Sequence, residues 1–117
     1  KNKILLATVK SKYSIVSSSA LLGAGTITMH NSIINAGAEI GMNCILNTNS
    51  LVEHEVKIGN HCHISTGAII NGGVTIGNES FIGSGCIIRE GIKIGDKVVV
   101  SAGKVIMKDI PPNTVFK

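Results

Sequence analysis

The 117-residue chain is poor in aromatic side chains, with two phenylalanines, one tyrosine and no tryptophan. It has no apolar run long enough to span a membrane, no signal-peptide pattern and no low-complexity segment, so we expect no membrane partner and a cytoplasmic location. Its three cysteines form no Cys-x-x-Cys pair, which argues against a zinc knuckle or a thioredoxin motif. The net charge of +4 is not clustered as it is in a nucleic-acid-binding patch.

Aliphatic residues, in contrast, recur every six positions through nearly the whole chain. From Ile4 only Lys10 and Thr28 interrupt a series that reads Val16, Leu22, Ile34, Ile40, Leu46, Val52, Ile58, Ile64, Ile70, Ile76, Ile82, Ile88, Ile94, Val100 and Ile106. A small or β-branched residue follows four positions after most of them, and Gly or Asn recurs between. A period of six fits neither a helix of 3.6 residues per turn nor a flat alternating strand. It predicts short strands separated by tight corners, and therefore an all-β hexapeptide-repeat parallel β-helix.

Three hexapeptides make one triangular coil, so residues eighteen apart should stack directly and the chain should form about six coils. At this length we expect one domain, residues 1–117. A narrow prism has no room for aromatic rings inside. Apolar residues also occupy outward positions, and exposed patches of this extent predict a homo-oligomer, which we expect to be a trimer.

The cysteines all fall at the small inward position, at Cys44, Cys62 and Cys86. We expect them to be reduced, buried and inert, since buried cysteine behaves as a small hydrophobic residue. Cys44 and Cys62 are eighteen residues apart and should stack, so distance alone leaves a disulfide between them open.

His54 is the strongest candidate for chemistry, because it lies at a corner with Glu53 before it and Glu55 after it. A neighbouring carboxylate can orient an imidazole and strengthen it as a base. This pattern is compatible with a general base, and equally with an inert surface histidine.

The other three histidines give weaker signals. His63 lies nine residues after His54, half a coil away, so only two subunits packed side by side could bring the two together. His61 stands where Gly or Asn is usual and is interpreted as a corner residue, and His30 receives no role.

The stretch from residue 47 to residue 68 resembles the signature of one subfamily of hexapeptide acetyltransferases. It contains Asn-Thr-x-Ser-x-Val-Glu-His-Glu followed by His-Ile-x-x-Gly-Ala. The subfamily includes sialic acid O-acetyltransferases and N-acetyltransferases of nucleotide-linked 4-amino sugars. The resemblance implies a left-handed β-helix, a homotrimer with active sites between subunits, and acetyl-CoA as co-substrate without a metal.

The same resemblance assigns roles to individual residues. His54 would be the general base and Glu55 would raise its basicity. His63 would contact acetyl-CoA, and the backbone N–H of Gly72, eighteen residues after His54, would face the thioester carbonyl. Ser84 and Ala102 are implied, more weakly, as residues lining the cofactor.

Two departures concern the acceptor. Family members usually carry an N-terminal α/β domain that binds the nucleotide of the acceptor, and nothing here resembles one, so the chain is interpreted as an excerpt of a longer protein. The usual His-Pro near the start of the β-helix is replaced by Lys10-Ser11-Lys12. Five lysines gather late in the chain, either as a solvated surface or as a strip for cofactor phosphates: Lys93, Lys97, Lys104, Lys108 and Lys117.

The expected function is transfer of an acetyl group from acetyl-CoA to an amine or hydroxyl of a sugar, by direct attack and without a covalent enzyme intermediate. Two alternatives stay open at this point. One is a catalytically silent β-helix that serves as an assembly platform. The other, a zinc protein resembling γ-class carbonic anhydrase, would require three histidine ligands.

Overall fold

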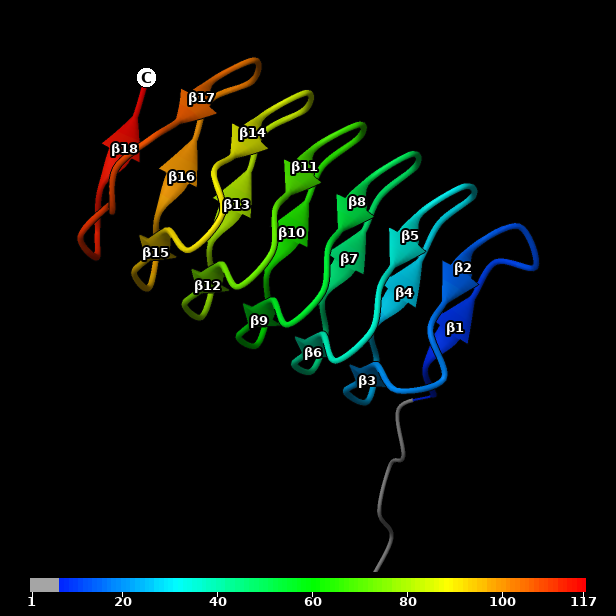
Figure 1. Cartoon of the computed structure of the whole chain (residues 1–117). Coiled ribbons are helices and arrows are strands. Elements are labelled where there is room, and N and C mark those ends of the chain that lie inside the picture. The colour runs from blue at the N-terminus through cyan, green and yellow to red at the C-terminus, as the bar shows by residue number, and fades with distance from the viewer. Residues whose placement is uncertain (1–6) are drawn as a thin grey trace, which may run out of the picture.

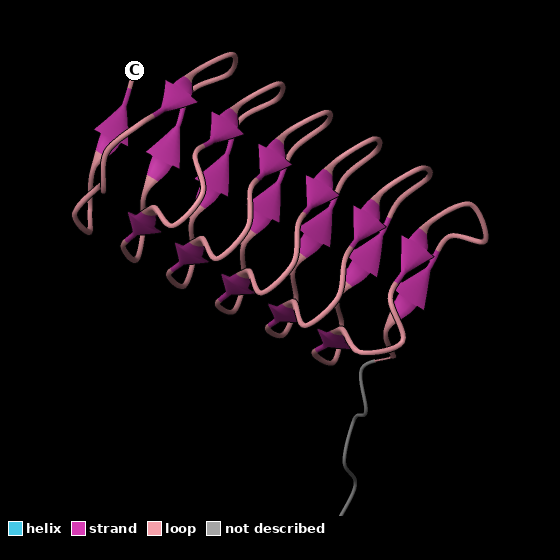
Figure 2. Cartoon of the chain, viewed as in Figure 1, coloured by secondary structure: helices cyan, strands magenta, loops and turns pink. Residues whose placement is uncertain are grey.

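The computed structural model describes residues 7–117, and within them all regular structure is β-strand (Figure 2). Ile4, where the six-residue period begins, lies outside the described residues. Each of the eighteen strands contains two residues, and a turn joins it to the next. Successive coils lie side by side along one axis (Figure 1), so the predicted parallel β-helix is confirmed. Within residues 7–117 no helix is long and apolar enough to cross a membrane.

Every third strand belongs to the same parallel sheet, and the three sheets form the three sides of the prism. Sheet A has seven strands: β1 (Val9–Lys10), β4 (Ile27–Thr28), β7 (Ile45–Leu46), β10 (His63–Ile64), β13 (Phe81–Ile82), β16 (Val99–Val100) and β18 (Val115–Phe116). Sheet B has six: β2 (Ile15–Val16), β5 (Ile33–Ile34), β8 (Leu51–Val52), β11 (Ile69–Ile70), β14 (Ile87–Ile88) and β17 (Val105–Ile106). Sheet C has five: β3 (Leu21–Leu22), β6 (Glu39–Ile40), β9 (Lys57–Ile58), β12 (Thr75–Ile76) and β15 (Lys93–Ile94).

Residues eighteen apart are register partners, as the sequence period predicts. Ile64, for example, pairs with Leu46 on one side and Ile82 on the other. The last coil is shorter, because Ile94 bridges to Ile110 and Val99 pairs with Val115. Pro111 and Pro112 occupy this coil, and proline has no N–H to donate to a ladder.

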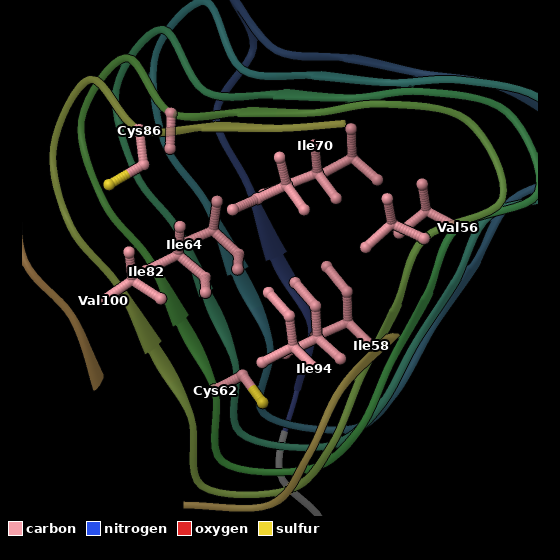
Figure 3. Close-up of a cluster of buried hydrophobic side chains, with 14 of the residues drawn as sticks. Val56, Ile58, Cys62, Ile64, Ile70, Ile82, Cys86, Ile94 and Val100 are labelled. Carbon is pink, nitrogen blue, oxygen red and sulfur yellow. The ribbon is translucent and has the colours of Figure 1, made fainter. Parts of the chain in front are cut away.

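The core is a column of inward side chains from all three sides (Figure 3). The large position holds fully buried residues such as Ile64, Ile70 and Ile82, and the small position holds Ala, Ser, Val and Cys. All three cysteines are free and buried. Each thiol donates to a carbonyl of the following coil, Cys44 to Gly59, Cys62 to Gly77 and Cys86 to Ser101.

Sharp corners require residues in the left-handed backbone region. Asn31, Asn43 and Asn49 adopt it with φ of 59°, 54° and 60°. Asn tolerates this region better than most residues with a side chain. His61 is also there, with φ of 60°, which fits the interpretation of His61 as a corner residue.

The three outer sides differ in chemistry. Outward positions on sheets A and B are almost all apolar, and some are well exposed, such as Ile15 (63%) and Val105 (57%). Outward positions on sheet C are mostly polar: Leu21, Glu39, Lys57, Thr75 and Lys93. The predicted apolar outer surface is therefore confined to two of the three sides.

Candidate functional site

The corner after β8 carries His54, and the corner after β11 places Gly72 beside it in the next coil. The strands register as Val52 with Ile70, so the two corners stack. Gly73 N–H donates to His54 O at 3.1 Å. A Cβ built on Gly72 would lie 2.8 Å from both Cε1 and Nε2 of His54. The glycine therefore leaves the space that the imidazole occupies, and the ring lies against the Gly72 backbone.

An open groove surrounds this corner, lined by Glu53, His54, Asn71, Gly72, Arg89 and Glu90. Glu53 is held in place because Asn35 Nδ2 of the preceding coil donates to its Oε1 at 2.7 Å. Asn71 Nδ2 donates to the Ile88 carbonyl at 2.9 Å, which holds this side chain in place. The groove thus places an imidazole, carboxylates, an amide and a guanidinium next to one another.

Glu55 takes a different direction from Glu53. Its backbone is left-handed, with φ of 60°. Its carboxylate lies over Gly37 of the preceding coil, where an added Cβ would collide with Oε2. Of the two carboxylates beside His54 in the sequence, Glu53 is the one that lines the groove with it.

His63 lies on the outer side of sheet A, away from the His54 corner. Asn47 Nδ2 is 3.2 Å from its Nε2, and the Phe81 ring meets it edge to face with centroids 5.1 Å apart. Burial among these groups lowers the pKa of His63, because the charged imidazolium loses hydration there.

Ser84 and Ala102 share a third location, the corner between sheets A and B. Gly103 N–H donates to Ser84 O at 2.8 Å, so the two corners stack, and Ser84 Oγ is 2.9 Å from Ser65 Oγ. Within one chain, the structure therefore brings His54 and Gly72 together and separately brings Ser84 and Ala102 together. His63 stands apart from His54.

His30 lies at the same A–B corner, three coils before Ser84. Its Nδ1 is within hydrogen-bond distance of Ser11 Oγ, and the Tyr13 ring lies edge-on to it with centroids 5.5 Å apart. The sequence gives no acidic neighbour to His30, and the structure surrounds it with a hydroxyl and a phenol ring instead.

The late lysines do not form one strip. Lys93 lies on the outer side of sheet C, Lys97 at the corner after it, and Lys108 at the corner after β17, between sheets B and C. Lys104 falls at the small inward position at the open end of the prism, where it is half-buried. This distribution matches solvated terminal coils rather than a continuous phosphate-binding surface. Among residues 7–117 no group of three or more His, Cys, Asp or Glu side chains could hold a metal ion.

The sequence interpretation missed three residues that line the groove and one, Asn35, that holds a lining residue in place. Asn35, Asn71 and Arg89 stand in one column with Glu53, and Glu90 stands in the column of His54 and Gly72. The eighteen-residue period would have found them, because each lies a multiple of eighteen from Glu53 or His54. Asn47 is harder to find, since it reaches His63 from sixteen residues away.

Two families of repeat proteins match segments of this chain. The family described as bacterial transferase hexapeptide (six repeats) matches residues 55–90, and the hexapeptide repeat of succinyl-transferase matches residues 73–108. No curated protein sequence matches the chain. The chain thus contains hexapeptide repeats like those of these two transferase families.

Solved structures narrow this class. The acetyltransferase domain of PglB from Neisseria gonorrhoeae, in complex with acetyl coenzyme A, is 35% identical with a TM-score of 0.94 over 97% of this chain and 56% of that chain. PerB from Caulobacter crescentus, in complex with CoA and GDP-perosamine, is 32% identical with a TM-score of 0.94 over 97% of this chain and 55% of that chain. WeeI from Acinetobacter baumannii is 26% identical, with a TM-score of 0.90 over 95% of this chain and 55% of that chain.

The chain therefore belongs to the hexapeptide-repeat acetyltransferase family. It spans about half the length of these structures, 56% of PglB and 55% of PerB.

Proposed function

We propose that this chain is the catalytic β-helix of an acetyltransferase that moves an acetyl group from acetyl-CoA to an amine or hydroxyl of a nucleotide-linked sugar. The observation that carries the proposal is the contact between the His54 imidazole and the Gly72 backbone in an open polar groove. The pair supplies the two groups that acyl transfer requires, a base and an N–H donor for the developing oxyanion.

The backbone at Gly72 supports the role of N–H donor to the developing oxyanion. Among the described residues, the N–H of Gly72 has no hydrogen-bond partner, whereas the neighbouring Gly73 N–H donates to His54 O. An unpaired N–H beside the base is available to the thioester carbonyl. A side chain at position 72 would push the ring away. Glycine at this position therefore leaves space for the imidazole next to the backbone N–H.

In the proposed reaction, the neutral ring of His54 takes the proton from the acceptor amine or hydroxyl as that group attacks the thioester carbon. The carbonyl oxygen gains negative charge and accepts a hydrogen bond from Gly72 N–H. Collapse of the tetrahedral intermediate breaks the C–S bond, and the CoA thiolate takes the proton back from His54. The predicted role of Glu55 would depend on its negative charge acting at a distance, because its carboxylate lies over Gly37 and Glu53 is the carboxylate that lines the groove with His54.

The relatives support the choice of both substrates. PglB was solved with acetyl coenzyme A, and PerB with CoA and GDP-perosamine, a nucleotide-linked amino sugar. We propose the same two classes of substrate here, with the donor passing His63, Ser84 and Ala102. A cytoplasmic location would fit these substrates.

The apolar outer sides of sheets A and B support a homotrimer, because each subunit of a cyclic assembly uses two different surfaces. Packing sheet A of one subunit toward the sheet B side of the next would bring His63 of one chain into the cleft that holds His54 of the other. The polar outer side of sheet C would face solvent. Sedimentation should show a trimer at micromolar concentration, and a stable monomer would contradict the shared cleft.

The activity is tested by thiol release from acetyl-CoA in the presence of GDP- and UDP-linked 4-amino sugars and of sialic acid. We expect release with at least one acceptor from the wild type, and loss of that release in His54→Ala. Full-length protein should be used beside the chain itself, because the acceptor can depend on segments outside it. Thiol release that is absent from both proteins with every acceptor would favour the silent assembly platform.

A further inference from the structure

The contact between Asn47 and His63 determines which nitrogen of the His63 ring carries a proton. Thr48 N–H donates to Asn47 Oδ1 at 2.8 Å. A backbone N–H can only donate, so the oxygen of the Asn47 amide must face Thr48 and its NH₂ group must face His63. The NH₂ group is also a donor only, and it lies 3.2 Å from His63 Nε2. His63 Nε2 therefore accepts, and the neutral ring carries its proton on Nδ1.

Packing holds the ring in this orientation. Phe81, on the neighbouring strand β13, meets the ring edge to face, with planes at 86° and centroids 5.1 Å apart. A ring flip would put Cε1 against the Asn47 amide and lose the hydrogen bond.

The surroundings of the ring also keep it uncharged. The two strands paired with β10 place Ile45 and Phe81 beside His63, and neither strand carries a charged side chain. Burial here lowers the pKa of His63, and donation from Asn47 to Nε2 opposes protonation of the same atom.

We infer that Asn47 is a positioning residue that fixes His63 as the neutral tautomer with its proton on Nδ1, so that His63 acts on the donor as a hydrogen-bond donor. The inference rests on the proposed function for the identity of the ligand. Acetyl-CoA fits the N–H chemically, because its long arm carries amide and thioester carbonyl oxygens and these only accept. Nδ1 of His63 has no protein partner among residues 7–117, so it is available to such an oxygen.

The tautomer is measured by ¹⁵N NMR of the histidine rings across pH, without any assay of activity. In the wild type we expect a protonated Nδ1 and an unprotonated Nε2 on His63 above its pKa. Asn47→Ala should mix the two tautomers. Asn47→Asp should place a carboxylate against Nε2, protonate that nitrogen and raise the pKa of His63 relative to the wild type. Signals of His30 and His61 serve as internal references, because neither contacts Asn47.

Thr48→Ala is the matched control, since it removes a neighbouring side chain and keeps the backbone donor that orients Asn47. It should leave the tautomer unchanged. Calorimetry with acetyl-CoA tests the consequence: Asn47→Ala should weaken binding by up to about tenfold, the effect of one lost hydrogen bond. Asn47→Asp should also weaken binding, although its side chain has nearly the same shape.

Different results would overturn the role of Asn47 and the contact of His63 with acetyl-CoA. A wild-type ring protonated on Nε2, in a protein that binds acetyl-CoA, would overturn the role of Asn47 and leave the proposed function intact. A wild type that binds no acetyl-CoA would overturn the donor contact together with the proposed function. Unchanged tautomer, pKa and affinity in both Asn47 variants would also overturn the role of Asn47.

Discussion

The His54 corner and the His63 side of sheet A are built in different ways. At the corner, one coil stacks on the next, so His54 and Gly72 meet within a single chain and need no partner. On sheet A, His63 is oriented by Asn47 and Phe81 but lies on a mostly apolar outer surface, away from His54. Under the proposed function, the chain would assemble its base by itself, and it would prepare a donor contact that only an adjacent subunit could bring to that base.

Removing the base should have the largest effect. His54→Ala is expected to lower kcat by about 10²–10⁴, the usual range for loss of a general base, with little change in the KM for acetyl-CoA. Steady-state kinetics with a true acceptor measures both constants. Near-normal turnover would show that the corner is only scaffold.

Crowding the base without removing it is the next test of the corner. Gly72→Ala should lower kcat by about 10- to 10²-fold, because the new Cβ would meet the His54 ring at 2.8 Å and displace it. Gly73→Ala is the matched control, since it has open space around its Cβ but a φ of +71°. That control should cost stability by about 1 kcal/mol and leave kcat unchanged. Equal effects of both variants on kcat would show that backbone strain, not contact with the ring, is responsible.

Substitution of His63 should change the binding of acetyl-CoA more than the turnover. His63→Ala is expected to raise the KM for acetyl-CoA by about tenfold, with a smaller change in kcat. Mixing unfolded His54→Ala and His63→Ala chains and refolding them together should restore wild-type-like sites at about a quarter of the interfaces of a cyclic trimer. Mixtures no more active than the two variants measured separately would mean that the two histidines do not share a cleft between subunits.

The pH dependence of donor binding should distinguish His63 from an ordinary surface histidine. Burial lowers its pKa, so more acid is required to protonate it. The KM for acetyl-CoA should therefore stay constant as the pH falls through about 6.5, the usual value for histidine. It should rise only below that pH, because a proton on Nε2 would set two donors, Nε2–H and the Asn47 NH₂ group, against each other and displace the ring. In His63→Ala this acidic rise should disappear. A rise that begins at or above the usual value would contradict the buried, neutral ring.

The smallest effect is expected at the thiols, which belong to neither region. Contact between the two thiols raises the pKa of Cys62 and lowers that of Cys44 to about 7, but all three thiols are buried and donate to carbonyls in the core, out of reach of a reagent. Alkylation of the native protein should therefore be negligible, and all three thiols should react after denaturation. A titre of one thiol in denaturant would reveal a disulfide between Cys44 and Cys62.

Much of this molecule follows from the spacing of its residues. The six-residue period predicted the strands, the three sides and the buried positions of Ile64 and Cys62, because a β-helix repeats one local geometry. It also predicted that Gly72 stacks on His54, which the structure confirms. The roles assigned to His54, Glu55, His63, Gly72, Ser84 and Ala102 remain predictions until the kinetics above are measured.

The period could not predict the directions of side chains at the corners. Glu53 and Glu55 flank His54 symmetrically in the sequence, yet Glu53 bonds to Asn35 and lines the groove, while Glu55 turns over Gly37. The backbone region that each residue adopts at the corner makes this difference, since Glu55 alone of the two is left-handed.

The sequence by itself determined the fold, because stacking of identical coils turns a linear period directly into contacts between residues eighteen apart. Only the tertiary structure decided which way each polar side chain turns and which neighbours it contacts. Those properties depend on how the three sheets close around the core and on hydrogen bonds between coils, such as that from Asn47 to His63. A contact of that kind departs from the eighteen-residue period, and the sequence pattern carries no signal for it.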